Sequence, residues 1–151
     1  MVMEVHQLDG YPVYLPGDLR RFVASPGALS AWVAEEKGVI LGHVALHSRT
    51  SDAALALACE SLGQPLERLG VIARLLVAPS ARKRGIGGKL LDIATQSALE
   101  RGLSPILDVV TNHSRAISLY EHFGWVRLGQ VTAKFSDGHE LDEIVMAHGP
   151  G

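Results

Sequence analysis

A predicted strand that runs through a glycine-rich turn into a predicted helix constrains the fold of this chain more than any other feature. The strand covers residues 71–77, an apolar run closed by Ala78-Pro79. Beyond the turn, apolar residues recur at helical spacing until Gly102 offers a helix stop. These apolar residues are Leu90, Leu91, Ala94 and Ala98. Alternating strands and helices of this kind predict an α/β fold.

The turn itself is basic and rich in glycine. It joins Arg82-Lys83-Arg84 to Gly85-Ile86-Gly87-Gly88-Lys89. Glycine lets the backbone approach a ligand closely, and the first N–H groups of a helix have no intrahelical partner. Those donors and the positive end of the helix dipole attract an anion. The turn is therefore predicted to bind a phosphate-bearing ligand, with a merely solvated basic turn as the alternative.

Two common phosphate-binding motifs do not fit this spacing. A P-loop requires a glycine five positions before the Gly-Lys pair and Ser or Thr after the lysine, but Lys83 and Leu90 stand there. The dinucleotide-binding fingerprint requires a third glycine three positions after the second, and that position is again Leu90. What remains is the spacing Arg82-x-x-Gly85-x-Gly87.

This spacing resembles the acyl-coenzyme A (acyl-CoA) pyrophosphate loop of the GNAT superfamily of N-acetyltransferases. The strand that ends in Leu75-Leu76-Val77 is similar to the family's fourth strand, and residues 107–110 are similar to its fifth. Residues 116–125 match the late helix and the turn into the sixth strand. These segments stand in the family's order, which makes the resemblance more specific than the loop alone.

The resemblance implies a single acyl-CoA N-acyltransferase-like domain over residues 1–151. The expected fold is α/β, a mixed, largely antiparallel central sheet flanked by helices, with splayed fourth and fifth strands. The family opens with a strand and a helix, for which this chain has only Met1 to Asp9. The N-terminal strand and helix are therefore expected to be shortened, and the sheet edge that this exposes would favour a homodimer.

Turn and cap residues predict the remaining elements. Residues 32–47 form a hairpin around Lys37-Gly38, and an Ala/Leu-rich helix covers residues 52–62 before Gly63. A short helix is expected at Gly17–Val23. The tail forms a final hairpin over residues 125–147 with an Asp-Gly turn.

The resemblance implies how acetyl-CoA would be bound. The basic turn would hold the pyrophosphate and the fourth strand would pair with the pantetheine arm. The family usually has Asn seven residues before a tyrosine of the late helix, where this chain has His113, with Asn112 one residue earlier. Either residue is a candidate cofactor contact, and helix capping is the alternative. The complete candidate set is Leu75, Leu76, Val77, Arg82, Lys83, Arg84, Gly85, Ile86, Gly87, Gly88, Lys89, Asn112 and His113.

The resemblance also implies a catalytic acid but leaves the base open. Tyr120, in the late helix, is expected to protonate the departing thiolate.

The base is less clearly marked, because the glutamate that many relatives carry on the fourth strand is replaced by Ala73. Asp108 matches a place on the fifth strand where some members carry an acidic base candidate, and burial would raise its proton affinity. A carboxylate that faces solvent or pairs with a basic residue is the alternative for Asp108. Glu67, His43 and His47 are further candidates without a motif.

These features predict an enzyme that transfers an acetyl group from acetyl-CoA to a primary amine by direct attack in a ternary complex. The missing fourth-strand carboxylate favours an alternative, a non-catalytic acyl-CoA-binding or regulatory domain. The acceptor, a small-molecule or peptide amine, has no motif of its own. Acidic residues of the final hairpin could attract a cationic amine, although a solvated hairpin explains them better; they are Asp137, Glu140, Asp142 and Glu143.

Composition limits the remaining classes. With 47% hydrophobic and 20% charged residues among 151, the chain is an ordinary globular one. A formal net charge of −2 argues against nucleic-acid binding. The lone Cys59 excludes an internal disulfide and suits the cytoplasm. No apolar run is long enough to predict a membrane span, and no metal is implied, because no His-Glu-x-x-His or Cys-x-x-Cys spacing occurs.

Overall fold

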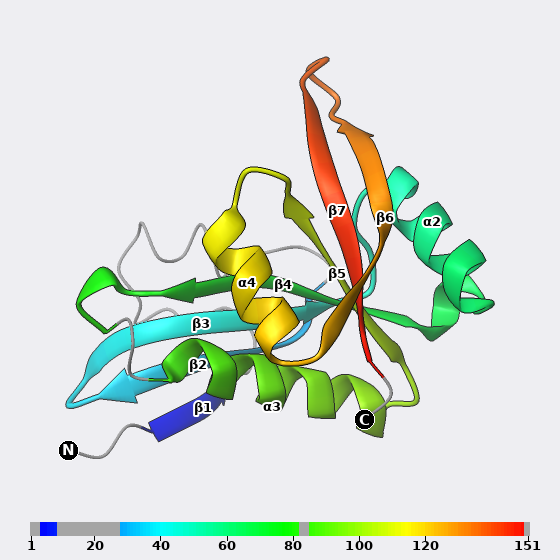
Figure 1. The fold of residues 1–151 in the computed structure, drawn as a ribbon. Coiled ribbons are helices and arrows are strands. Elements are labelled where there is room, and N and C mark those ends of the chain that lie inside the picture. The colour runs from blue at the N-terminus through cyan, green and yellow to red at the C-terminus, as the bar shows by residue number, and fades with distance from the viewer. Residues whose placement is uncertain (1–3, 9–27, 82–84, 150–151) are drawn as a thin grey trace. The chain divides into compact units, whose positions relative to one another are not determined.

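A computed structural model describes residues 4–8, 28–81 and 85–149 (Figure 1). The predicted helix at Gly17–Val23 and the cations Arg82, Lys83 and Arg84 lie outside these residues. The elements are β1 (Glu4–Leu8), β2 (Ala28–Glu36), β3 (Val39–His47), α2 (Asp52–Leu62), a 3₁₀ turn (Leu66–Arg68), β4 (Leu69–Val77), a second 3₁₀ turn (Pro79–Ala81), α3 (Ile86–Glu100), β5 (Ser104–Val110), α4 (Ser114–His122), β6 (Trp125–Lys134) and β7 (Glu140–His148).

The chain divides into two compact units. Unit 1 consists of Met1–His47 and Ile72–Ser97, and unit 2 consists of Ser48–Val71 and Ala98–Gly151. β4 and α3 each contribute residues to both units. The predicted phosphate-binding turn therefore belongs to unit 1, whereas Asp108 and Tyr120 belong to unit 2.

The strands follow the order β1-β2-β3-β4-β5-β7-β6. Antiparallel pairs join β1 to β2, β2 to β3, β5 to β7 and β6 to β7. β4 and β5 are parallel, and they pair only from Leu69–Val71 to Ser104–Ile106 although both strands continue beyond that point. The predicted mixed, largely antiparallel sheet with splayed fourth and fifth strands is confirmed. The expected short N-terminal strand is β1.

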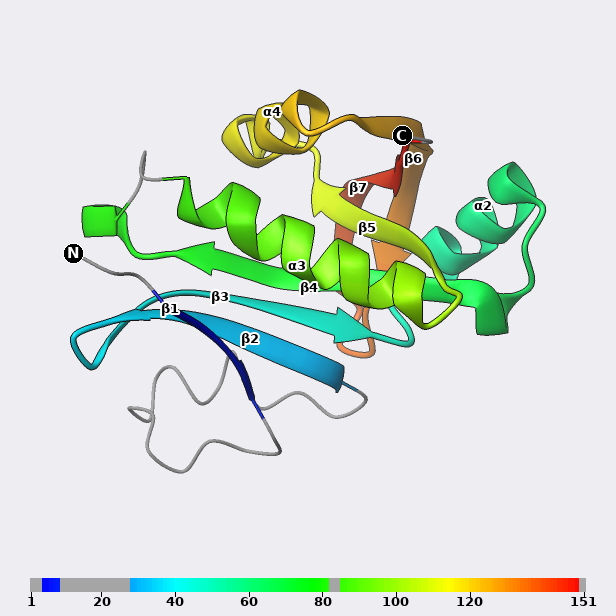
Figure 2. The same cartoon turned by 90° about the horizontal axis from the view of Figure 1, so that it is seen from below.

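In unit 1, the predicted helix after the glycine turn covers strands of the sheet. Figure 2 shows α3 running alongside β4 and β3. The residues predicted from helical spacing all lie on the buried face of α3, which is why the spacing identified the helix. They are Leu90, Leu91, Ala94 and Ala98.

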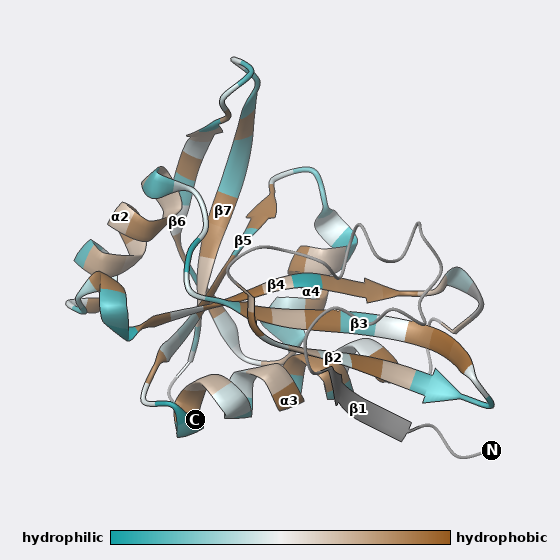
Figure 3. Cartoon of the chain, turned by 180° about the vertical axis from the view of Figure 1, so that it is seen from behind, coloured by the Kyte–Doolittle hydropathy of each residue, from teal (hydrophilic) through white to brown (hydrophobic). Residues whose placement is uncertain are grey.

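The hairpin of β2 and β3 turns where the sequence predicted. Lys37 and Gly38 have positive φ angles of 51° and 79°, the conformation that a two-residue hairpin turn requires. Figure 3 shows the mostly hydrophobic course of β3 and the hydrophilic end of β2 next to this turn. The hairpin thus places a buried strand, β3, in the interior of unit 1.

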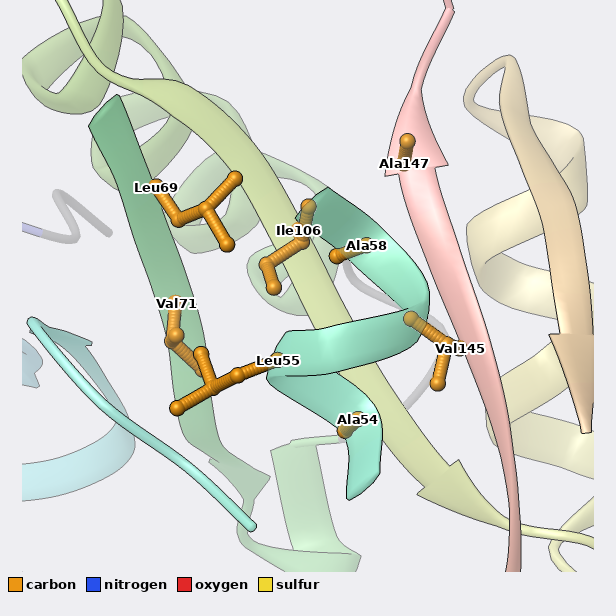
Figure 4. Close-up of a cluster of buried hydrophobic side chains, with 8 residues drawn as sticks. All are labelled: Ala54, Leu55, Ala58, Leu69, Val71, Ile106, Val145 and Ala147. Carbon is orange, nitrogen blue, oxygen red and sulfur yellow. The ribbon is translucent and has the colours of Figure 1, made fainter. Parts of the chain in front are cut away.

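In unit 2, α2 packs on β4, β5 and β7 through small and branched apolar side chains (Figure 4). These are Ala54, Leu55, Ala58, Leu69, Val71, Ile106, Val145 and Ala147. The helix begins at Ser51, whose hydroxyl accepts a hydrogen bond from the Ala54 N–H at 3.2 Å, and ends at Gly63 with φ 63°. Both caps fix where α2 starts and stops. Cys59 is partly buried and packs against this cluster.

Gly42 on β3 leaves no room for a side chain. A Cβ at this position would lie 2.9 Å from the Leu76 carbonyl oxygen, 2.9 Å from Leu90 Cδ1 and 3.2 Å from Ile86 Cγ2. Because a backbone carbonyl cannot move aside cheaply, we expect Gly42→Ala to lower the free energy of unfolding by about 1–3 kcal/mol. Urea denaturation measures this change. Val39→Thr, on an exposed position of the same strand, is the control and should change stability by less than about 0.5 kcal/mol. Equal stability of Gly42→Ala and wild type would contradict this close packing.

Candidate active site

The N-terminus of α3 supplies backbone donors in unit 1. Gly85 stands just before the helix with φ 76°, a conformation that favours glycine. Its carbonyl accepts the first helical hydrogen bond, from the Lys89 N–H at 3.1 Å. The N–H groups of Ile86, Gly87 and Gly88 precede that bond and have no intrahelical acceptor. This geometry is suited to an anion, and Lys89 is exposed beside it.

The end of β4 is the second predicted contact in unit 1. Leu75, Leu76 and Val77 are all partly buried. Directly after them, the Ala78 N–H donates to the Leu41 carbonyl at 2.7 Å, which ties the end of β4 to β3. The approach of Leu76 to Gly42 holds the same segment. The two parts of the predicted cofactor site that lie among the described residues, Leu75–Val77 and Gly85–Lys89, thus belong to one unit.

Arg74 interrupts the regular course of β4. Its φ of 55° is uncommon for a residue with a side chain and costs conformational energy. The Arg74 carbonyl accepts a hydrogen bond from His43 Nδ1 at 2.9 Å. The distortion directly follows Ala73, where the family's usual carboxylate is missing.

His43 and His47, two of the other base candidates, are buried on β3 with exposed fractions of 2% and 8%. The Nε2 atoms of both rings are buried and have no hydrogen-bond partner among the described residues. Burial lowers the pKa of both side chains, and the charge of Arg74 lowers each further. Both rings are therefore neutral near pH 7, and a neutral imidazole is suited either to packing in the interior or to accepting a proton as a base.

Among the described residues, Asp108 in unit 2 is held by the hydroxyl of Thr50. Both of its carboxylate oxygens accept hydrogen bonds from Thr50 Oγ1, each at 3.0 Å. Thr50 directly precedes Ser51, the N-cap of α2, so the start of α2 fixes the donor. Asp108 is partly buried on β5. Its role as a base stays a prediction.

Glu143 is a carboxyl group that the sequence did not single out. Its side chain is only 8% exposed, and Oε1 has no hydrogen-bond partner among the described residues. Burial, followed by the charge of Asp108 and a hydrogen bond with it, raises the pKa of Glu143 to about 7. The expectation of a solvated acidic hairpin was therefore wrong for Glu143, although Asp137, Glu140 and Asp142 are exposed. Alternation in the sequence could not separate the two residues, because Asp142 alternates with Ile144 and Met146, which are as buried as Val145 and Ala147.

Tyr120 lies on α4 and packs against Trp125, with the ring centroids 6.3 Å apart. Burial, and then the charge of Asp108, raises the pKa of Tyr120 to about 12. The hydroxyl is therefore protonated at neutral pH, as a proton donor must be. Because Asp108 acts electrostatically on both Tyr120 and Glu143, these three ionisable groups form one neighbourhood of unit 2.

A sequence model described as the acetyltransferase (GNAT) family matches residues 1–125. The chain belongs to the GNAT acetyltransferase family. The match includes β1 to α4, and with them the glycine turn, Asp108 and Tyr120.

Known GNAT proteins resemble this chain over different lengths. The uncharacterized N-acetyltransferase YhfO of Bacillus subtilis is 31% identical over 94 residues, which are 62% of this chain and 56% of YhfO. The chain thus spans little more than half of that curated relative. A yncA acetyltransferase structure from Salmonella typhimurium, with its cofactor acetyl-CoA, has a TM-score of 0.58 and 21% identity over 78% of this chain and 62% of the other. Arabidopsis thaliana NAA60 with acetyl-CoA has a TM-score of 0.68 and 16% identity over 97% of both chains. At these identities the solved structures show a shared fold.

Two of the candidate cofactor contacts lie just before α4. Asn112 and His113 both face outward before α4. The His113 backbone caps the helix, accepting from the Ile117 N–H at 3.0 Å, but its side chain makes no capping hydrogen bond. The imidazole of His113 therefore has no structural partner in the cap.

Neither a membrane-spanning helix nor a metal-binding cluster occurs among the described residues. No helix among them is both long and apolar enough to cross a membrane. Within the same residues, no group of three or more His, Cys, Asp and Glu side chains is arranged to hold a metal ion.

Proposed function

We propose that this chain transfers an acetyl group from acetyl-CoA to a primary amine by direct attack within a ternary complex. The observation that carries this proposal is the start of α3 in a chain of the GNAT family, where Gly85 has a positive φ and the N–H groups of residues 86–88 precede the first helical hydrogen bond of the described residues. Two relatives of the same fold were solved with acetyl-CoA, which supports acetyl-CoA as the cosubstrate.

The proposed cofactor contacts follow the family pattern. The turn from Arg82 to Lys89 holds the pyrophosphate, Leu75–Val77 pair with the pantetheine arm, and Asn112 or His113 adds a further contact. A backbone N–H at Leu76 or Val77 donates to the oxyanion of the tetrahedral intermediate. These roles rest on the resemblance and on the free donors at the start of α3.

The proposed chemistry needs one base and one acid. The acceptor must lose a proton before its nitrogen attacks the thioester carbon, and Asp108 takes that proton. The carbon–nitrogen bond then forms and gives the tetrahedral oxyanion. Collapse of this intermediate breaks the carbon–sulfur bond, and Tyr120 gives its proton to the departing thiolate. The amide nitrogen loses its second proton, which restores Tyr120. Acetyl-CoA and the ammonium form of the amine thus yield the acetamide, CoA and one proton.

Calorimetric titration with acetyl-CoA, followed by thiol release with a panel of amines, tests this proposal. The panel contains polyamines, free amino acids and short peptides with a free N-terminus. Binding together with amine-dependent thiol release is the expected result. Binding without thiol release from any amine would favour the alternative, a non-catalytic acyl-CoA-binding domain, which the alanine at position 73 supports. A folded protein that does not bind acetyl-CoA would refute both functions.

We further propose that the chain works as one domain over residues 1–151, as a homodimer in the cytoplasm, on a small-molecule or peptide amine. The lone Cys59 suits a reducing compartment. Among the described strands, β1 stands at one end of the strand order, and such an edge favours pairing with a second copy. We expect sedimentation at micromolar concentration to give the mass of a dimer, and a monomer would contradict this assembly.

A further inference from the structure

Two carboxyl groups of unit 2 are neighbours across a pair of strands. Asp108 on β5 lies opposite Val145 on β7, and Glu143 on β7 lies opposite Val110 on β5. Asp108 and Glu143 are therefore diagonal partners on one face of the sheet, within reach of each other. Val145 and Ala147 continue that face into the core beneath α2. Two carboxyls side by side at the edge of an apolar core require an explanation.

The two carboxyls differ in what supports them. Asp108 is partly buried, and the Thr50 hydroxyl donates to its carboxylate, at 3.0 Å from each oxygen, which fixes the side chain in place. Glu143 is 8% exposed and its Oε1 has no partner among the described residues. The group that acts on Glu143 is Asp108, an anion. Asp108 can therefore meet a ligand, while the buried Glu143 favours holding a proton.

We propose that Asp108 and Glu143 form a two-carboxyl base, in which Asp108 takes the proton of the acceptor amine and Glu143 holds it. This inference rests on the proposed acetyl transfer and adds Glu143 to it. An N–H bond of the ammonium breaks and an O–H bond forms on Asp108. The hydrogen bond between the two carboxyls then lets the proton reside on Glu143, and it leaves to solvent after turnover. Thr50 and Glu143 are positioning residues, because only Asp108 meets the amine.

The electrostatics of the pair set a pH dependence. The pKa of Glu143 is raised to about 7, so below that pH Glu143 already carries its proton and the pair cannot accept another as readily. Activity is expected to rise with pH through about 7. Other groups near the pair do not compete with this titration. Tyr120 on α4 stays protonated. Helix α2 packs against β7 and carries two further carboxylates. Of these, Asp52 pairs with Arg49, and Glu60 is exposed.

The same pKa shift has a second consequence, for stability. Between the ordinary glutamate pKa of 4.5 and about 7, the folded state holds a proton on Glu143 that the unfolded state has released. The free energy of unfolding therefore falls as the pH rises through this window. We expect Glu143→Gln to flatten this part of the stability–pH curve, because glutamine does not titrate.

Glu143→Gln also tests the catalytic proposal, since glutamine mimics the protonated glutamate in shape and still donates to Asp108. We expect turnover with the best amine of the panel to fall by about a hundredfold, and the rise of kcat with pH near 7 to disappear. The Kd for acetyl-CoA should stay within about twofold of wild type. Glu60→Gln, an exposed change on α2, is the matched control and should keep the wild-type profile.

Asp108→Asn separates the two carboxyls. It removes the anion that raises the proton affinity of Glu143, so the Glu143 titration should move to lower pH. Carboxyl-labelled glutamate NMR follows this titration without any amine, and Glu143→Gln identifies the signal.

A wild-type Glu143 that titrates in the ordinary carboxyl range would overturn the inference. A Glu143→Gln enzyme with normal turnover and an unchanged pH rise would also overturn it while leaving the proposed acetyl transfer intact. Wild type that binds acetyl-CoA but acetylates no amine would instead refute the proposed function.

Discussion

A Gly87→Glu variant is expected to bind acetyl-CoA about a hundredfold more weakly than wild type, a change of about 2.7 kcal/mol in binding free energy. Gly87 is the second residue of α3, and its N–H is one of the free donors at the start of the helix. A carboxylate at this position repels the pyrophosphate. Isothermal titration calorimetry with acetyl-CoA measures the affinity.

The stability of the same variant should not fall, which separates lost binding from unfolding. Glutamate has a higher helix propensity than glycine, and an anion in the first turn of a helix is stabilising. Gln96→Glu is the matched control, because it adds a carboxylate to an exposed position near the other end of α3. Its affinity should stay within about twofold of wild type. If both variants bound acetyl-CoA normally, the start of α3 would not be the phosphate site.

Tyr120→Phe is expected to lower kcat by about a hundredfold while leaving the Kd for acetyl-CoA nearly unchanged. The substitution removes only the hydroxyl, so the packing of the ring against Trp125 remains. The hydroxyl is protonated at neutral pH because burial and the charge of Asp108 raise the pKa of Tyr120 to about 12. Without it, the thiolate departs unprotonated. Thiol release with a saturating amine measures kcat.

Ser118→Ala provides the comparison for Tyr120→Phe. It removes a hydroxyl from an exposed position on the same helix, so kcat should not change. A drop in kcat for Tyr120→Phe alone supports the acid role. Equal kcat in Tyr120→Phe and wild type would remove Tyr120 from the chemistry and leave it as a core aromatic residue.

The elements that the sequence predicted well are those whose signals are local. The Lys37-Gly38 turn, the Ser51 and Gly63 ends of α2 and the buried face of α3 each depend on residues within a few positions of one another. Backbone preference and apolar spacing act over the same range. The glycine turn before α3 is also local, which is why its spacing alone pointed to the GNAT family.

The carboxyl pair was not predictable in the same way. Glu143 stands in an acidic hairpin, and nothing next to it in the chain distinguishes it from Asp142, which is exposed and accepts a hydrogen bond from Thr132 at 2.8 Å. Only the strand register, which sets Glu143 opposite Val110, puts it next to Asp108. A shift of one residue would have turned Glu143 to the other face.

By itself, the sequence determined the family and most of the described elements, because their signals lie in contiguous residues. The tertiary structure decided which polar groups meet. Thr50 reaches Asp108 across 58 residues, and His43 reaches the Arg74 carbonyl across 31. Contacts of this kind depend on strand pairing and burial, and burial determines whether a carboxyl or an imidazole keeps its ordinary pKa. The raised pKa values of Tyr120 and Glu143 are therefore a property of the fold.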